Sequence, residues 1–201
     1  MDADKIHIRR LTPADAAMYR GIRLEGLNSS PEAFGSTFET EFSKPLAWFF
    51  DRLSNSQIFG AFLGSEILGI AGFAVREGTK ESHKGLLWGM YVRPVARGTG
   101  VAQRLVEAVI EFARLRVELI QLSVVMGNEP ARRLYARLGF VEYGIERNSL
   151  KHDGRYYDEI LMAKDLTAVS PQDAMSVPVA DDTLRSNGSA MSIELAPPSV
   201  G

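Results

Sequence analysis

The 201 residues of this chain are enough for one domain, and an apolar fraction of 45% with a charged fraction of 24% is typical of a soluble globular protein. The chain has no cysteine, which excludes disulfides, zinc–thiolate sites and cysteine nucleophiles. Its formal net charge of −2 argues against a nucleic-acid-binding domain, which usually carries a strongly basic face.

Neither a secretion signal nor a membrane span is predicted. The first ten residues, MDADKIHIRR, are charged and lack the apolar core of a signal peptide. The longest apolar-rich run, Ile67–Val75, is too short to cross a bilayer. Together with the absence of cysteine, which fits a reducing compartment, these features predict a cytoplasmic protein with no membrane partner.

The first half of the chain begins with a strand pattern followed by a helix pattern. The alternating apolar residues of 6–11 predict the strand. Thr12 is a suitable N-cap for the helix, Pro13 suits its first turn, and Leu24 and Leu27 fit its apolar face. The elements predicted next are a loop over 28–39 with aromatic anchors at Phe34 and Phe38, a short helix over 45–53 and a β-hairpin over 57–77.

The second half of the chain also contains both strand and helix patterns. Strands are predicted over 85–92, over 117–125 and, as a final pair, over 141–150 and 154–166, with an amphipathic helix over 99–116. A further helix is capped by Asn128 and ends at Gly139, a residue suited to the left-handed position after a helix. This order of elements predicts a mixed α/β domain with one sheet over residues 1–166.

The composition changes after Leu166. Residues 167–201 are rich in Ser, Pro and Ala and contain no aromatic residue, so they cannot bury enough apolar surface to offset their ordering entropy. A disordered tail is predicted there; the alternative is a partner-binding peptide around the segment MSIEL.

The segment MYVRPVARGTGVAQRL, residues 90–105, joins a strand to a helix through a loop rich in glycine and arginine. A helix N-terminus presents unpaired N–H groups and the positive end of the helix dipole, which together bind phosphates. Gly98 and Gly100 allow close approach of the backbone, and Arg93, Arg97 and Arg104 add charge. The alternative interpretation is a tight turn with surface arginines.

Two nucleotide-binding motifs are disfavoured for this loop. The pattern GxxxxGK[ST] is absent, and the pattern GxGxxG fails because Gln103 occupies the place of its third glycine. The hypothesis of a nucleotide-binding protein would hold only if ATP or NAD, and not coenzyme A, stabilised the fold.

The sequence resembles the GNAT superfamily of acyl-CoA-dependent N-acetyltransferases, whose pyrophosphate loop reads [RQ]xxGx[GA]. Arg97, Gly100 and Ala102 match this loop, and Asn128 with the segment LYARLGF, residues 134–140, matches a second family motif at the expected spacing. The resemblance covers about residues 6–166. It implies the GNAT fold, a mixed sheet of six to seven strands flanked by four helices, with a splayed strand pair that holds acetyl-CoA.

The resemblance also implies where acetyl-CoA binds. Backbone groups of the strand 85–92 would pair with the pantetheine arm, and one of their N–H groups would polarise the thioester carbonyl. Asn128 would face the same arm, beside its role as a helix cap. The residues assigned to the cofactor on this basis are Met90, Tyr91, Val92, Arg97, Gly98, Thr99, Gly100, Val101, Ala102 and Asn128.

Tyr135 corresponds to the usual general acid of the family, which gives a proton to the departing thiolate. The alternative is a core aromatic, because Tyr135 lies on the apolar stripe of its predicted helix. The general base is less defined, since the strand 85–92 contains no carboxylate. Glu25 and Glu32 are candidates for substrate contacts or proton uptake, and water or an already neutral amine are alternatives.

The resulting hypothesis is an acetyl-CoA-dependent N-acetyltransferase that acts on a primary amine of a small molecule or a protein. Acceptor specificity is expected in the loop that contains Phe34, in the hairpin 57–77 and before Tyr156. The rival hypothesis is a catalytically weak acyl-CoA-binding regulatory module. No metal is expected, because the three histidines show no ligand spacing. The oligomeric state stays open, and a homodimer through the last strands is compatible with the resemblance.

Overall fold

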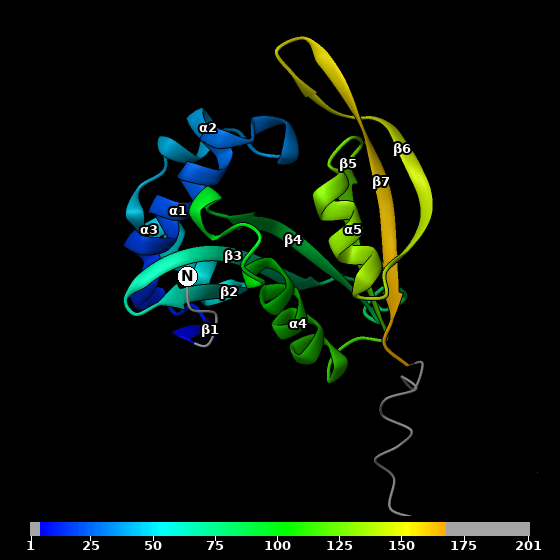
Figure 1. Cartoon of the computed structure of the whole chain (residues 1–201), viewed down its shortest axis with the longest axis horizontal. Helices are drawn as coiled ribbons and strands as arrows, with labels where there is room; N and C mark the ends of the chain where they lie inside the picture. Colours follow the sequence, from blue (N-terminus) through cyan, green and yellow to red (C-terminus); the bar gives the residue numbers. More distant parts are fainter. Residues whose placement is uncertain (1–4, 168–201) are drawn as a thin grey trace, which may run out of the picture. The chain divides into compact units, whose positions relative to one another are not determined.

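The computed structural model describes residues 5–167, which form a seven-stranded mixed sheet in the order β1-β2-β3-β4-β5-β7-β6 (Figure 1). The strands are β1 (Ile6–Arg10), β2 (Gln57–Leu63), β3 (Glu66–Val75), β4 (Lys84–Val92), β5 (Leu119–Val125), β6 (Val141–His152) and β7 (Arg155–Asp165). The predicted mixed α/β fold with a single sheet is confirmed. The tail prediction for 167–201 lies outside the described residues, apart from Thr167.

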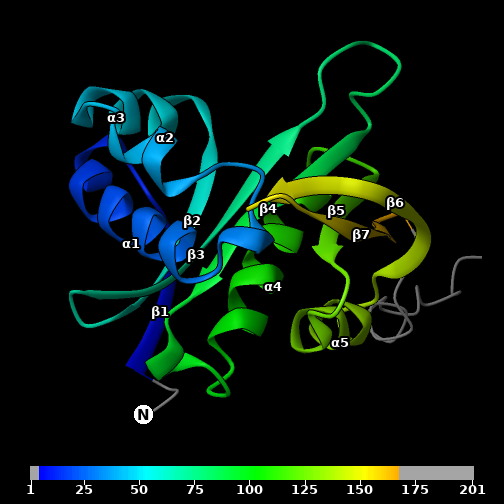
Figure 2. The same ribbon diagram turned by 90° about the horizontal axis from the view of Figure 1, so that it is seen from above.

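Two hydrophobic cores lie on opposite faces of the sheet. One face is covered by α4 (Val101–Arg114) and α5 (Glu129–Arg137), and the other by α1 (Ala16–Ser29) and α3 (Leu46–Asn55) (Figure 2). Because β2 and β3 are covered on both faces, the central residues of both strands are buried, which explains their continuous apolar sequence. None of the helices within residues 5–167 is long and apolar enough to cross a membrane.

The segment between α1 and α3 differs from the prediction of a loop over 28–39. It contains a 3-10 turn at Pro31–Ala33 and the short helix α2 (Phe38–Phe42). Thr37 caps α2, since its hydroxyl oxygen accepts a hydrogen bond from the backbone N–H of Thr40 at 3.2 Å. The prediction of a loop was therefore wrong for residues 28–29, which end α1, and for residues 38–39, which begin α2. A helix of five residues is too short to show a helical period.

A buried ion pair joins α1 to α2. The guanidinium of Arg23 donates to both carboxylate oxygens of Glu41, at 3.0 and 2.7 Å, and both side chains are at most 5% exposed. Burial opposes ionisation of Glu41, but the hydrogen bonds and charge of Arg23 outweigh it and lower the pKa of this carboxyl. The pair therefore holds α2 against α1.

The parallel strands β4 and β5 separate along their length. They pair only at their beginnings, from Lys84 opposite Leu119 to Leu86 opposite Gln121. Further along, β4 stays paired with β3 and β5 with β7, and a bulge at Gly89 and Met90 bends β4. The predicted splayed strand pair is present, and it opens a space bounded by β4, β5 and α5 (Figure 1).

Candidate active site

A groove of about 920 Å³ lies between the ends of β4 and β5. It extends from the loop before α4 to the first turns of α5. A smaller inner cavity of about 110 Å³ adjoins it at the β4 bulge, since the two share Phe34, Met90, Val125, Asn128 and Tyr135 in their walls. Together the two spaces connect the glycine-rich loop before α4 to the buried phenol of Tyr135.

The loop between β4 and α4 forms one end of the groove. Gly98 and Gly100 have φ of +75° and +86°, a left-handed conformation that favours glycine, and both line the groove. Gly100 is the N-cap of α4 and supplies no side-chain cap, so backbone N–H groups of the first turn are available to an anion. A Cβ built at either glycine meets no atom within 4 Å, which leaves room for a phosphate.

Two further side chains shape this loop. The hydroxyl of Thr99 donates to the carbonyl oxygen of Ala96 at 2.7 Å, and Nε of Arg97 donates to the carbonyl oxygen of Val92 at 3.2 Å. Arg97 and Ala102 line the groove, whereas Val101 is fully buried in the core, so it can offer a ligand only its backbone. The predicted loop residues are thus brought together at one helix N-terminus.

A valine in place of Gly100 is expected to remove acetyl-CoA binding. The new side chain would occupy the space in front of the α4 N-terminus. A ligand present at 100 times its dissociation constant stabilises a fold by about 2.7 kcal/mol, and Gly100→Val should lose this stabilisation in thermal unfolding with acetyl-CoA.

Gly78→Val is the matched control, because Gly78 has φ of +93°, an equally open environment and no place in the groove. Both variants should lose about 1–2 kcal/mol of intrinsic stability from backbone strain. Equal acetyl-CoA stabilisation of the two would contradict the assignment of the loop.

The outer part of β4 forms one wall of the groove. Met90, Tyr91 and Val92 line it, and no residue of β4 beyond Leu86 pairs with β5. Backbone groups on this edge are therefore available to an extended ligand, in the manner of an added strand. This is the arrangement expected for the pantetheine arm.

Asn128 lies on the opposite wall and caps α5. Its Oδ1 accepts a hydrogen bond from the backbone N–H of Ala131 at 3.3 Å, as predicted for an N-cap, and the residue lines both the groove and the inner cavity. Its side-chain amide N–H₂ stays available for a ligand, so capping and ligand binding are compatible.

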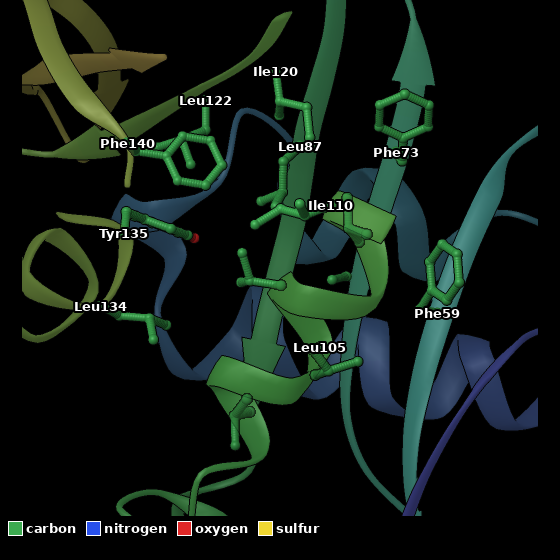
Figure 3. Packing of buried hydrophobic residues seen from close by; sticks show 14 of the residues in the cluster. Phe59, Phe73, Leu87, Leu105, Ile110, Ile120, Leu122, Leu134, Tyr135 and Phe140 are labelled. Atoms are coloured by element: carbon green, nitrogen blue, oxygen red, sulfur yellow. The ribbon is translucent and has the colours of Figure 1, made fainter. Parts of the chain in front are cut away.

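Tyr135 is 5% exposed and packs edge to face on Phe140, with ring centroids 5.8 Å apart (Figure 3). Its hydroxyl points toward β4 (Figure 3), and the residue lines both cavities. Burial raises the pKa of Tyr135 above its usual range, so the phenol stays protonated throughout the neutral range. The residue is thus a core aromatic whose protonated hydroxyl lies at the wall of the site.

The candidate acceptor residues separate into two groups. Phe34 lines both cavities and Glu32 lines the groove. Glu25 lines neither, because its carboxylate accepts hydrogen bonds from the hydroxyl of Tyr91 at 3.1 Å and from Nε of Arg93 at 2.9 Å. Arg93 also pairs with Glu66, so its charge is already matched by two carboxylates.

Several residues of the inner cavity were missed by sequence reasoning, namely Trp88, Gly89, Ser123 and Val124. Trp88 and Gly89 belong to the strand that the resemblance places beside the cofactor, so their position in LLWGMYV was a usable signal. Ser123 had only one signal, as the single hydroxyl in the strand LIQLSVV.

The splayed strands, the anion-binding loop and the buried tyrosine define a protein of the acetyl-CoA-dependent acetyltransferase class. The family model described as "Acetyltransferase (GNAT) family" matches residues 25–140, and the chain belongs to this family. The resemblance inferred from the loop and helix motifs is confirmed.

Relatives of known activity or structure agree with this membership. The chain is 27% identical over 156 residues to the L-amino acid N-acetyltransferase AaaT of Escherichia coli (strain K12), covering 75% of this chain and 94% of the relative. A GNAT acetyltransferase structure from Streptococcus pneumoniae matches with a TM-score of 0.71 and 23% identity, over 80% of this chain and 98% of that one. The yncA structure from Salmonella typhimurium with its cofactor acetyl-CoA matches with a TM-score of 0.67 and 21% identity, over 88% and 99%.

Proposed function

We propose that the protein transfers the acetyl group of acetyl-CoA to a primary amine, on a small molecule or a protein, by direct attack within a ternary complex. The observation that carries this proposal is the groove itself, which joins the Gly98–Ala102 backbone at one end to Tyr135 at the other. A pyrophosphate held at the α4 N-terminus would direct the rest of acetyl-CoA along β4 toward the bulge and the phenol.

Each part of the groove has a chemical role in this proposal. The loop N–H groups bind the pyrophosphate, and the outer edge of β4 holds the pantetheine arm. A backbone N–H near the β4 bulge donates a hydrogen bond to the carbonyl oxygen of the acetyl-CoA thioester as negative charge develops on that oxygen. Tyr135 gives its proton to the thiolate that leaves, whose thiol has a pKa of about 8.5 when unperturbed.

A free amino acid is one acceptor class to test first, because the E. coli relative is named an L-amino acid N-acetyltransferase. Glu32 and Phe34, which line the groove, are proposed to contact the acceptor. The rival, an acyl-CoA-binding module without turnover, differs in only one measurable respect, the release of free thiol.

The test is acetyl-CoA binding followed by turnover. Acetyl-CoA should raise the unfolding temperature, and a panel of L-amino acids, polyamines and peptide amines should include at least one that releases coenzyme A thiol. Binding without thiol release over the whole panel would favour the regulatory module, and stabilisation by ATP or NAD but not by acetyl-CoA would contradict both.

A further inference from the structure

A serine in the wall of the inner cavity is hydrogen-bonded to a carboxylate behind it. The hydroxyl of Ser123 on β5 donates to Oε1 of Glu159 on β7 at 2.7 Å, and the hydroxyl of Ser149 on β6 donates to Oε2 at 2.6 Å. Both oxygens of Glu159 are thereby oriented. Because the Ser123 proton points to Glu159, the lone pairs of its oxygen remain to accept a hydrogen bond from the cavity.

The inner cavity otherwise lacks a group that takes up protons. Its described lining residues include no Asp, Glu or His. Other carboxylates are engaged or lie outside this cavity: Glu25 binds Arg93 and Tyr91, Glu41 is buried against Arg23, and Glu32 lines only the outer groove. An amine must lose a proton before it attacks, since an alkyl ammonium has a pKa of about 10.4. Ser123 is the one hydroxyl of this wall that is linked to a carboxylate.

We propose that Ser123 and Glu159 form the site that receives the primary ammonium of the acceptor and takes up its proton. This inference rests on the proposed acetyl transfer. Ser123 is the catalytic residue that touches the acceptor nitrogen, and Glu159 acts through Ser123 as a positioning residue and proton acceptor. The ligand class is a cation with at least one N–H, attracted by the carboxylate behind the hydroxyl.

The proton balance of the step is complete. One ammonium proton passes to the Ser123 oxygen while the Ser123 proton passes to Oε1 of Glu159, and from there it is released to solvent. The nitrogen lone pair then forms the N–C bond as the C–S bond breaks. Sulfur takes the proton of Tyr135, and the second proton lost by nitrogen restores the phenol, so one proton is released in each turnover.

The surroundings of Glu159 favour a cation. Glu146 on β6 lies directly opposite Glu159 in the strand register, so the two side chains share one face of the sheet. Glu32 lies in the 3-10 turn that packs against β5 and β6. Tyr143, which accepts a hydrogen bond from Gln121 of β5, and Tyr157, which lines the groove, are titratable side chains of the same region.

Ser123→Ala is the principal test, because the side chain is exposed and its loss should leave the fold intact. With the best amine of the panel, kcat/KM at pH 7 should fall by about 10²-fold or more, the usual size of general base catalysis. The deficit should shrink as the pH approaches about 10, where the amine is neutral in solution. Glu159→Gln should show the same pH-dependent deficit, and Ser123→Thr, which keeps the hydroxyl, should restore most of the rate.

Glu111→Gln is the matched control, since it removes an equal charge from an exposed glutamate of α4 that lines neither cavity. It should keep the wild-type pH profile. A deficit in Ser123→Ala that is equal at every pH, or no deficit at all, would overturn the proposal while leaving acetyl transfer by the wild type established. A wild type that binds acetyl-CoA but acetylates no amine would overturn the proposed function, and this inference with it.

Discussion

Replacing Glu41 with glutamine is expected to lower the free energy of unfolding by about 3–5 kcal/mol, the usual cost of breaking a buried ion pair by removing one partner. Glutamine keeps the shape of the side chain but leaves the Arg23 charge buried without its counterion. The nearby guanidinium of Arg52 also interacts with Glu41, so the remaining charges repel each other. Urea unfolding followed by circular dichroism measures the loss.

The buried polar groups around Glu41 explain why its loss should be so destabilising. The buried side-chain N or O atoms without a hydrogen-bond partner in residues 5–167 are the hydroxyl of Tyr19, Nη1 of Arg23 and Nε of Arg52. The pKa of Tyr19 is raised chiefly by burial, and the charges of Arg52, Arg23 and Glu41 act on it as well, which places all four groups together. Removing the one carboxylate leaves two cations and no anion among these four groups.

Glu39→Gln provides the matched control, because Glu39 lies on the same short helix but is exposed, and its loss should change stability by less than about 0.5 kcal/mol. The double variant Arg23→Met with Glu41→Met should be more stable than either single one, because neither charge is then left alone. A double variant as unstable as the sum of the two singles would show that the ion pair does not act as a unit.

Low pH should remove the stabilisation by the Arg23–Glu41 ion pair in the wild type. The folded-state pKa of Glu41 is lowered, so its stabilisation is present above the pKa of an unfolded glutamate, about 4.3, and is lost as the pH falls through the folded value. The stability difference between the wild type and Glu41→Gln should therefore be constant near neutral pH and shrink below about pH 4. A difference that grows on acidification would contradict this assignment.

The elements of the fold followed from local sequence patterns. Alternation predicted the strands. The helices α4 and α5 were recognisable from apolar periodicity, with Asn128 and Gly139 marking the ends of α5. The order of these elements is itself informative. A strand followed by a glycine-rich loop and a helix places the N-terminus of that helix, which can bind an anion, beside the end of the strand. For this reason the cofactor half of the candidate site could be proposed from the sequence.

The acceptor half could not be predicted in the same way. Ser123 and Glu159 meet only because β5 and β7 are neighbours in a register that places them diagonally, and 35 residues of chain separate them. Arg23 and Glu41 also depend on tertiary packing, because α2 is too short to show a pattern. Single-sequence reasoning gives no register between distant segments, so contacts of this kind appear only in the folded chain.

Substitution of Tyr135 with phenylalanine is expected to lower turnover by about 10²–10⁴-fold, the usual contribution of general acid catalysis, which is about 3–5 kcal/mol of barrier. The ring and its edge-to-face contact with Phe140 are retained, so only the hydroxyl is lost. Acetyl-CoA affinity should be nearly unchanged, because the loop and β4 supply the binding groups. The measurement is thiol release with a saturating amine, beside acetyl-CoA binding by thermal shift.

Tyr19→Phe is the matched control for this substitution. Tyr19 is 1% exposed, its hydroxyl has no hydrogen-bond partner and burial also raises its pKa, but it packs in the core on the opposite face of the sheet. Loss of a buried hydroxyl therefore affects both variants, whereas loss of a proton donor affects only Tyr135→Phe. Because the pKa of Tyr135 is raised, the wild-type rate should show no loss from ionisation of this phenol below about pH 10. If Tyr135→Phe turns over as fast as Tyr19→Phe, the proton reaches the thiolate from another group, and Tyr135 contributes to the fold alone.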